Sequence, residues 1–144
     1  MALSPNFSFP EPDNSSLVKN GAQDIRALGD AIDSTLAGLT VNAQTGTSYT
    51  AVKADGLNAI VTMDNAAANT FSIPTDATYA FPTGTTLLVY MKGAGVTTIN
   101  AVTPGTTTIN SAGAVAASPV LAQYKSAACI KVAANSWIVV GAIA

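Results

Sequence analysis

The apolar and polar positions of this chain follow two different patterns, and the change between them lies near residue 40. Apolar residues between positions 18 and 39 recur at helical spacing, with four of them seven residues apart. From position 45 onwards, apolar and polar residues alternate in short runs, which is the period of a strand. The sequence therefore predicts an amphipathic helix followed by a β domain. The helical stripe consists of Val18, Ile25, Leu28, Ile32, Leu36 and Leu39.

The predicted helix has two candidate starts and one end. It begins either within residues 13–16, which offer several capping residues, or at Asn20, which has capping-box spacing to Gln23. Gly38 predicts its end. The face opposite the stripe is expected to carry the charged residues Asp24, Arg26, Asp30 and Asp33.

The apolar stripe needs a partner, because the helix is short and contains Gly21 and Gly29. Isoleucine at successive positions of a seven-residue stripe favours a parallel bundle of three helices. The sequence therefore favours self-association, and packing on the β domain of the same chain is the alternative. The trimer interface would comprise Val18, Ile25, Leu28 and Ile32.

The β domain, residues 41–144, consists of short candidate strands separated by Gly, Pro and Asn turns. Strands at roughly 8–12-residue spacing predict an antiparallel β-sandwich or a small barrel. The apolar runs 87–90 and 137–140 predict central strands. The expected strands are 47–53, 59–63, 70–73, 85–92, 96–100, 106–110, 114–118, 127–133 and 136–143. The expected core is Phe71, Ile73, Leu87, Val89, Ile99, Ile109, Ile130, Val132, Trp137 and Val139.

A short internal repeat lies within this domain: residues 95–100, Gly-Val-Thr-Thr-Ile-Asn, recur as Gly-Thr-Thr-Thr-Ile-Asn at 105–110. We interpret the two copies as equivalent strands, each with its Ile turned inward and its Thr residues turned out. Two copies are too few to indicate a solenoid.

The first residues of the chain, before the helix, alternate proline with phenylalanine. Proline restricts both its own backbone and that of the preceding residue to extended conformations. We therefore expect residues 6–12 to form an extended arm that presents two aromatic rings for another surface to cover. With the helix, this arm forms an N-terminal domain of residues 1–40. The residues of the arm are Phe7, Phe9, Pro10 and Pro12.

Composition excludes several function classes. The chain has no histidine, and its net charge is −2, with only 10% charged residues. Without histidine it lacks the commonest general base and metal ligand, and its six scattered basic residues do not form the cluster that nucleic acid requires. Neither a signal peptide nor an apolar run as long as a membrane span is visible. We expect a protein made in a cytoplasm that binds neither nucleic acid nor membrane.

The candidate chemical groups of the β domain are equally sparse. Asp55, Asp64 and Asp76 lie beside turn signals, where an aspartate commonly bonds to its own backbone. Cys129 lies in an apolar run, which indicates a small buried side chain rather than a reactive thiol. The sequence predicts no catalytic residues, no metal site and no cofactor, and hence a protein that is not an enzyme.

Two stretches resemble structural proteins of tailed-bacteriophage virions. Residues 9–13, Phe-Pro-Glu-Pro-Asp, and the following 17–32, Leu-Val-Lys-Asn-Gly-Ala-Gln-Asp-Ile-Arg-Ala-Leu-Gly-Asp-Ala-Ile, are similar to an N-terminal segment of tail fibres and of small head-fibre or capsid-decoration proteins. The β domain is similar to domains of the same proteins at residues 44–50, 73–74, 81–85, 109–113 and 135–141.

This resemblance implies a function. The chain is expected to be a homotrimeric virion protein on the capsid surface, assembled in the host cytoplasm: a decoration, cement or head-fibre subunit that binds the major capsid protein. Phe7, Phe9, Pro10 and Pro12 are then the expected docking residues on the particle. The alternative is a short tail fibre or receptor-binding protein whose β domain contacts a glycan or protein of the host surface. The resemblance brings no catalytic residue.

Overall fold

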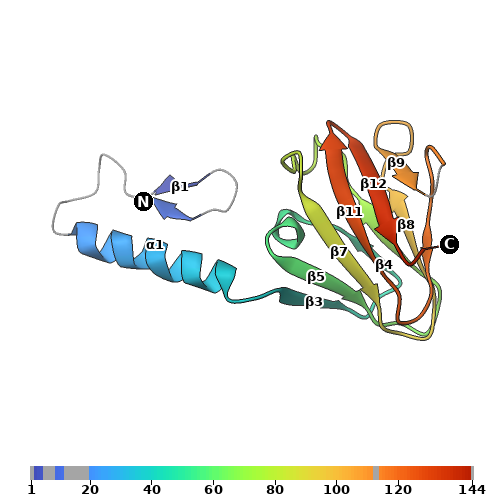
Figure 1. Cartoon of the computed structure of the whole chain (residues 1–144), viewed down its shortest axis with the longest axis horizontal. Coiled ribbons are helices and arrows are strands. Elements are labelled where there is room, and N and C mark those ends of the chain that lie inside the picture. The colour runs from blue at the N-terminus through green and yellow to red at the C-terminus, as the bar shows by residue number, and fades with distance from the viewer. Residues whose placement is uncertain (1, 5–8, 12–19, 112–113, 144) are drawn as a thin grey trace. The chain divides into compact units, whose positions relative to one another are not determined.

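The computed structural model of the chain describes residues 2–4, 9–11, 20–111 and 114–143. It is mainly β with one α-helix near the N-terminus, which confirms the general expectation from the sequence (Figure 1). The chain divides into two compact units, Met1–Leu39 and Thr40–Ala144, called here the N-terminal unit and the β unit.

The N-terminal unit consists of a small hairpin and a helix. Strand β1 (Ala2–Leu3) pairs antiparallel with β2 (Pro10–Glu11), and β2 lies alongside helix α1 (Gly21–Leu36). The helix ends as predicted, because Gly38 follows it with a φ of +139°. The capping-box prediction is wrong, since the side chain of Asn20 at the N-cap forms no capping hydrogen bond.

The β unit contains one sheet of six strands and one of four. In spatial order, the six-stranded sheet is β3 (Thr40–Gln44), β5 (Ala59–Met63), β7 (Thr86–Met91), β11 (Ser126–Ala133), β12 (Ser136–Gly141) and β9 (Thr108–Ser111). The four-stranded sheet is β10 (Val120–Leu121), β8 (Thr97–Ala101), β6 (Asn69–Ile73) and β4 (Ser48–Thr50). A short 3-10 helix, η2 (Lys53–Gly56), connects β4 to β5.

Successive strands from β3 to β10 alternate between the two sheets, so that the chain crosses from one sheet to the other after each strand. We call this winding of the chain the coil. From β3 to β8, strands two apart in sequence are therefore neighbours and run parallel, as β3–β5–β7 and β4–β6–β8. The prediction of antiparallel sheets is wrong, because the glycine and asparagine turns carry the chain across to the other sheet instead of reversing it within one. The described antiparallel pairs of the β unit are β7–β11, β11–β12 and β8–β10.

Two glycines show how closely the turns of this coil are stacked. A Cβ atom built on Gly93 would collide with the backbone of Asn65, and one built on Gly95 would collide with the carbonyl group of Ala67. The turn between β7 and β8 therefore lies directly against the turn between β5 and β6, at a distance that only glycine allows.

One core unites the two sheets, with Phe71, Ile73 and Ile99 from the four-stranded sheet and Leu87, Val89 and Val139 among those from the six-stranded sheet. Within this core, Phe81 meets Trp137 edge-on, with ring centroids 5.6 Å apart. Most of the predicted core is confirmed, including the central positions of β7 and β12.

Ile130 and Val132 are the exceptions to the predicted core. Strand β11 turns Ala127, Cys129 and Lys131 inward, so Ile130 is half-buried and Val132 is 45% exposed. For Ile130 and Val132 the predicted inward and outward positions of β11 were wrong by one residue. A shift of one residue along a strand exchanges its two faces.

Three further expectations need correction. Residues 114–118 form no strand; the nearby strand is β10, and β3 lies where no strand was predicted. In the repeat, Ile99 and Ile109 are buried as expected, but Thr97 and Thr107 are buried with them. Thr97 turns inward because its hydroxyl donates to Asn69 Oδ1 at 2.6 Å, which satisfies both buried polar groups.

Candidate interaction surfaces

The apolar stripe of α1 is exposed. Ile25 is 66% exposed, Ile32 38% and Leu36 78%, while Leu28 is half-buried. Val18, the first residue of the predicted trimer interface, lies outside the described residues. The structure therefore places three apolar side chains of the stripe on the surface of the helix, at a spacing that suits a second helix.

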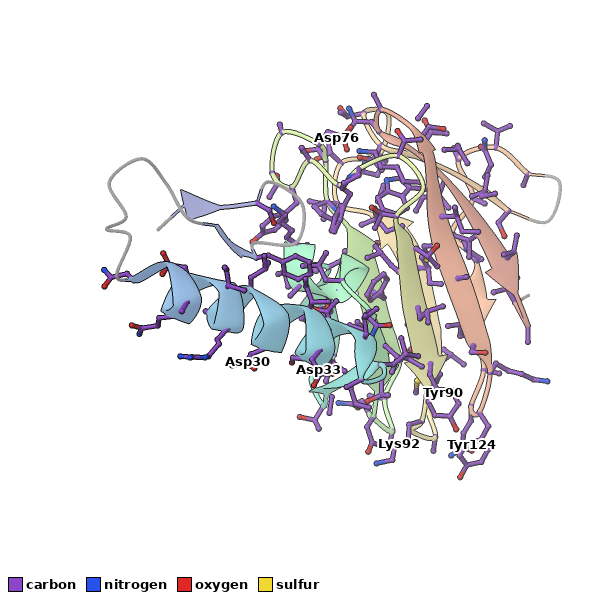
Figure 2. All side chains as sticks on the ribbon, turned by 60° about the vertical axis from the view of Figure 1, so that its left-hand side comes forward. Asp30, Asp33, Asp76, Tyr90, Lys92 and Tyr124 are labelled. Carbon is purple, nitrogen blue, oxygen red and sulfur yellow. The ribbon has the colours of Figure 1, made fainter. Side chains whose placement is uncertain are left out.

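The helix buries a neighbouring face, which shares Leu28 with the stripe and otherwise carries smaller side chains. Ala27, Leu28 and Ala31 are partly buried there, and the Thr35 hydroxyl donates to the carbonyl oxygen of Ala31 at 2.8 Å. Asp24 is 6% exposed, so its predicted position on the charged face is wrong. The other predicted charged residues, Arg26, Asp30 and Asp33, are exposed; Figure 2 shows both aspartates on one side of the helix.

Only part of the predicted docking arm is described. Phe9 is half-buried and closes the small hairpin: its N–H donates to Ser4 Oγ and its carbonyl oxygen accepts from the Ser4 N–H, each at 2.9 Å. Pro10 begins β2. Phe7 and Pro12 lie outside the described residues.

The outward face of the six-stranded sheet is apolar. The strand register aligns one outward residue from each of five neighbouring strands in a row across the sheet. The residues of this row are Val41, Ile60, Leu88, Ala128 and Val140. A parallel row contains Ile130 opposite Ile138. We call these seven residues the apolar face.

The outward face of the four-stranded sheet has the opposite character. Its register aligns Ser48 with Thr70, Thr98 and Val120, and Thr50 with Ser72 and Asn100. The Ser72 hydroxyl donates to Asn100 Oδ1 at 2.8 Å, so these groups bond across the surface of the sheet. We call this the hydroxyl face.

The charged residues of the β unit lie at the ends of the sheets. Lys92 and Asp64 form an exposed pair, 2.7 Å apart, beyond the ends of β7 and β5. The hydrogen bond that the Lys92 ammonium donates to Asp64 raises the pKa of Lys92 above its usual value. Figure 2 shows Tyr90, Lys92 and Tyr124 together at one end of the β unit and Asp76 at the other.

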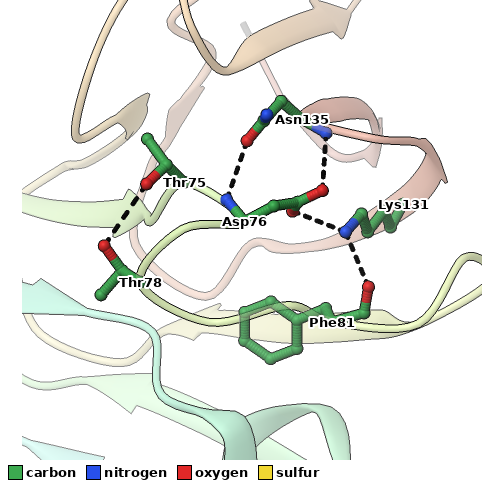
Figure 3. A network of polar contacts seen from close by, with 6 residues as sticks. All are labelled: Thr75, Asp76, Thr78, Phe81, Lys131 and Asn135. Atoms are coloured by element: carbon green, nitrogen blue, oxygen red, sulfur yellow. Dashed lines mark hydrogen bonds and ion pairs between the residues drawn. The ribbon is translucent and has the colours of Figure 1, made fainter.

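A buried ion pair connects Asp76 to Lys131 (Figure 3). The Lys131 ammonium is 4% exposed and donates to Asp76 Oδ1 and to the Phe81 carbonyl oxygen, each at 2.6 Å. The Asn135 N–H donates to Asp76 Oδ2 at 3.0 Å, and the Asp76 N–H donates to Asn135 Oδ1 at 2.8 Å. Asp76 was expected to bond its own backbone; it instead fastens the β11–β12 turn to the segment after β6.

A buried carboxylate, Asp55, lies near the start of the coil. Asn42 donates to its Oδ1 at 2.7 Å, and the Tyr49 hydroxyl and the Val52 N–H donate to Oδ2 at 2.8 Å. The bond from Val52 is the local backbone bond that the sequence predicts. Burial, together with the hydrogen bond to Asp55, raises the pKa of Tyr49 to about 12. Each oxygen of this carboxylate has a donor from the chain itself.

Two further observations concern ligand chemistry. Cys129 is fully buried, as predicted, and burial raises the pKa of its thiol to about 12. Among the residues that the structure describes, no group of three or more His, Cys, Asp or Glu gathers to hold a metal ion. Within the same residues, no helix combines the length and apolar character needed to cross a membrane.

Comparison of the chain with protein-family models, with curated proteins and with solved structures found no match.

Sequence reasoning missed the apolar face, although the sequence carries a signal for it. The runs Leu87–Tyr90 and Trp137–Val140 are apolar at both odd and even positions, which is typical of strands covered on both sides. Alternation alone identifies the core-facing half of each run. The other half becomes a surface only when the strand register aligns its residues across the sheet.

Proposed function

We propose that this protein is a structural protein of a bacteriophage virion that binds the assembled capsid as a homotrimer, as a decoration, cement or head-fibre subunit. The observation that carries the proposal is the exposed stripe of Ile25, Ile32 and Leu36 on a helix of 16 residues that contains two glycines and is marginal alone. Isoleucine at seven-residue spacing favours three helices in parallel. The resemblance of residues 9–32 to virion proteins supports the same conclusion.

The distribution of charge also supports an assembled protein. Of the few charged residues in the β unit, Asp55 and Lys131 are buried, and Asp64 and Lys92 form an ion pair at one end. The sheet faces therefore contribute little charge to keep separate copies apart in solution. Such a surface suits a protein that is largely covered by copies of itself and by the capsid.

The mechanism proposed is physical rather than catalytic. The α1 stripe holds three copies together, and the arm with Phe7, Phe9, Pro10 and Pro12 docks each copy on the major capsid protein. Three linked contacts bind more tightly than one, because the second and third form at high effective concentration. A subunit that binds only the assembled shell stabilises it by mass action.

The proposal includes no catalysis and no cofactor. The carboxylates of Asp55, which is buried, and of Asp76, which is partly exposed, receive hydrogen bonds on both oxygens from donors of the chain, as expected of structural groups. We also propose that the two sheets pack as a β-sandwich, which the single core built from both sheets supports.

Labelling of intact virions with antibody against residues 41–144 tests the location. Label spread over the head is expected. Label confined to the tail would support the alternative, a short tail fibre or receptor-binding protein, and binding of the protein to host cells would then be the next measurement. Intact virions that take no label would contradict both functions.

A double substitution tests the arm. Phe7→Ala with Phe9→Ala is expected to lower occupancy of the particle while the β unit keeps its thermal transition. Tyr124→Ala, which removes a 68% exposed aromatic ring from a turn of the β unit, is the control and is expected to leave occupancy unchanged. Equal occupancy of all three proteins would contradict the role of the arm.

A further inference from the structure

The apolar face differs from an ordinary sheet surface in that it lacks charge. Outward positions of its strands carry Val, Ile, Leu, Ala, Thr, Ser, Tyr and Asn side chains, and none of those described is charged. Val41 is 62% exposed and Val140 48%, so these side chains are open to solvent in the single chain. An apolar row across five strands is more than the isolated surface residues that any soluble protein shows.

The hydroxyl face provides an internal comparison. Both faces belong to the same β unit, yet one presents hydroxyl and amide groups and the other aliphatic groups. The apolar face therefore results from which residues are directed outward in the six-stranded sheet, and not from the overall composition of the chain. One side of the β unit suits water and the other suits a protein surface.

We propose that the apolar face is an interface between copies of this chain, and that it associates with a second copy in the particle-bound assembly. This inference rests on the proposed self-association and adds a second contact to the one formed by α1. Interfaces between identical subunits are the most apolar class, whereas contacts with separate soluble partners are about as polar as the rest of a protein surface. Identical faces without charge also meet without like-charge repulsion or a buried unpaired charge.

The relief of the face fits a copy of itself. Ile60, Leu88, Ala128 and Val140 line a hollow of about 350 Å³, whose small residues Ala128 and Gly141 leave room above the sheet. The pair Ile130 and Ile138 stands in the neighbouring row. Ile130 and Ile138 are half-buried aliphatic side chains beside this hollow, so the face offers a second copy both a recess and apolar side chains to contact.

The size of the face indicates how strong this contact can be on its own. Six strands about 4.8 Å apart, with about five residues each at ~3.3 Å per residue, span roughly 450 Å². A pair of copies then buries on the order of 900 Å², which is less than the ~1,200–2,000 Å² of specific, stable interfaces and is typical of a weak contact. The α1 stripe adds to this area in the same assembly.

Two matched lysine substitutions in the full-length protein test the inference. Leu88→Lys places a charge at the centre of the apolar face, and Thr98→Lys places one on the hydroxyl face. Both positions are half-buried and outward, and both lie within their sheets. Sedimentation velocity over a hundredfold range of concentration measures association, and circular dichroism of the thermal transition shows that each variant is folded.

The wild-type protein and Thr98→Lys are expected to associate equally, and Leu88→Lys at least tenfold more weakly. If Leu88→Lys does not fold, Ala128→Gln in the same row replaces it, with the same expectation. Equal association of the apolar-face variant and wild type, or a wild-type protein that is monomeric throughout, would overturn the inference. If Leu88→Lys associated normally but occupied the particle less than wild type, the inference would also be overturned, and the apolar face would be assigned to contact with the capsid.

A helix variant separates this inference from the proposed function. Ile25→Lys with Ile32→Lys disrupts the α1 stripe and leaves the apolar face unchanged. Dissociation by the helix variant alone would support the α1 trimer and overturn the apolar face as a contact. Dissociation by Leu88→Lys alone would support the apolar face and contradict the α1 trimer.

Discussion

The two outward faces of the β unit differ more from each other than either differs from a typical sheet surface. Thr70, Thr98 and Ser72 give the four-stranded sheet a polar surface, while Ile60, Leu88 and Val140 give the six-stranded sheet an aliphatic one. The backbone does not impose this difference, because both sheets contain strands of the same alternating coil. The outward residues alone decide which side of the unit suits water.

The inward side of the six-stranded sheet shows the reverse arrangement. Lys131 is directed into the protein and is almost fully buried, while its neighbours Ile130 and Val132 are directed outward. A buried ammonium is stable only when it is paired and fully hydrogen-bonded, as Asp76 and the Phe81 carbonyl group make it. The sheet thus holds its charge inside, by a specific pairing, and leaves its exposed face without any.

Breaking the buried pair is expected to have the largest effect. Asp76→Ala leaves Lys131 buried without its counter-ion, so it should reduce the free energy of unfolding by about 3–5 kcal/mol. Urea denaturation measures the loss. The double variant Asp76→Ala with Lys131→Met removes both charges and should recover much of it. A single variant as stable as wild type would contradict a structural role for the pair.

Gly95→Ala tests the stacked turns that support both faces. The added methyl group collides with the carbonyl group of Ala67, and we expect a loss of about 1–3 kcal/mol from the resulting strain. Gly46→Ala is the control, because its Cβ would have no neighbour closer than 3.8 Å. Urea denaturation of both variants checks the expectation. Equal stability of the two would show that the turns separate at little cost.

Converting the hydroxyl face into an apolar one makes the comparison sharper. Thr70→Val with Thr98→Val extends an aliphatic row to Val120 and changes no core contact, so stability should change by less than about 0.5 kcal/mol per site. The variant should nevertheless form larger assemblies than wild type, as sedimentation velocity would show. An unchanged mass would mean that aliphatic character alone does not drive association.

The smallest expected effect concerns Tyr49, which joins the edge strands of the two sheets through Asp55 and Asn42. Its pKa is raised from 10.0 to about 12 in the folded protein. The folded state therefore holds this proton more tightly than the unfolded state does. The resulting stability is present below pH 10 and is lost as the pH rises towards 12.

Denaturation at several alkaline pH values measures this loss of stability. Tyr49→Phe should remove the part of the loss that ionisation of Tyr49 causes. Ultraviolet titration should show one tyrosine that ionises later than the others. If Tyr49→Phe and wild type lost stability in parallel above pH 10, the hydrogen bond to Asp55 would not be the cause.

Local patterns allowed much of the fold to be predicted from the sequence. Helix α1 and its end at Gly38 follow from the spacing of apolar residues and from the conformational freedom of glycine. The central strands β7 and β12 follow from aliphatic runs that are rare outside a core. The burial of Cys129 follows from its apolar neighbours. Each of these features depends on residues close together in the chain.

What the sequence left undecided depends on pairing between distant segments. The same turn residues serve a hairpin or a crossing between sheets, so only the tertiary structure decided that most strand pairs are parallel. Only the β11 register decided that Lys131 lies inside and Ile130 outside, because shifting the register by one residue exchanges the two faces of a strand. The apolar face is likewise a product of register: its residues are far apart in the sequence and become one surface only when five strands align.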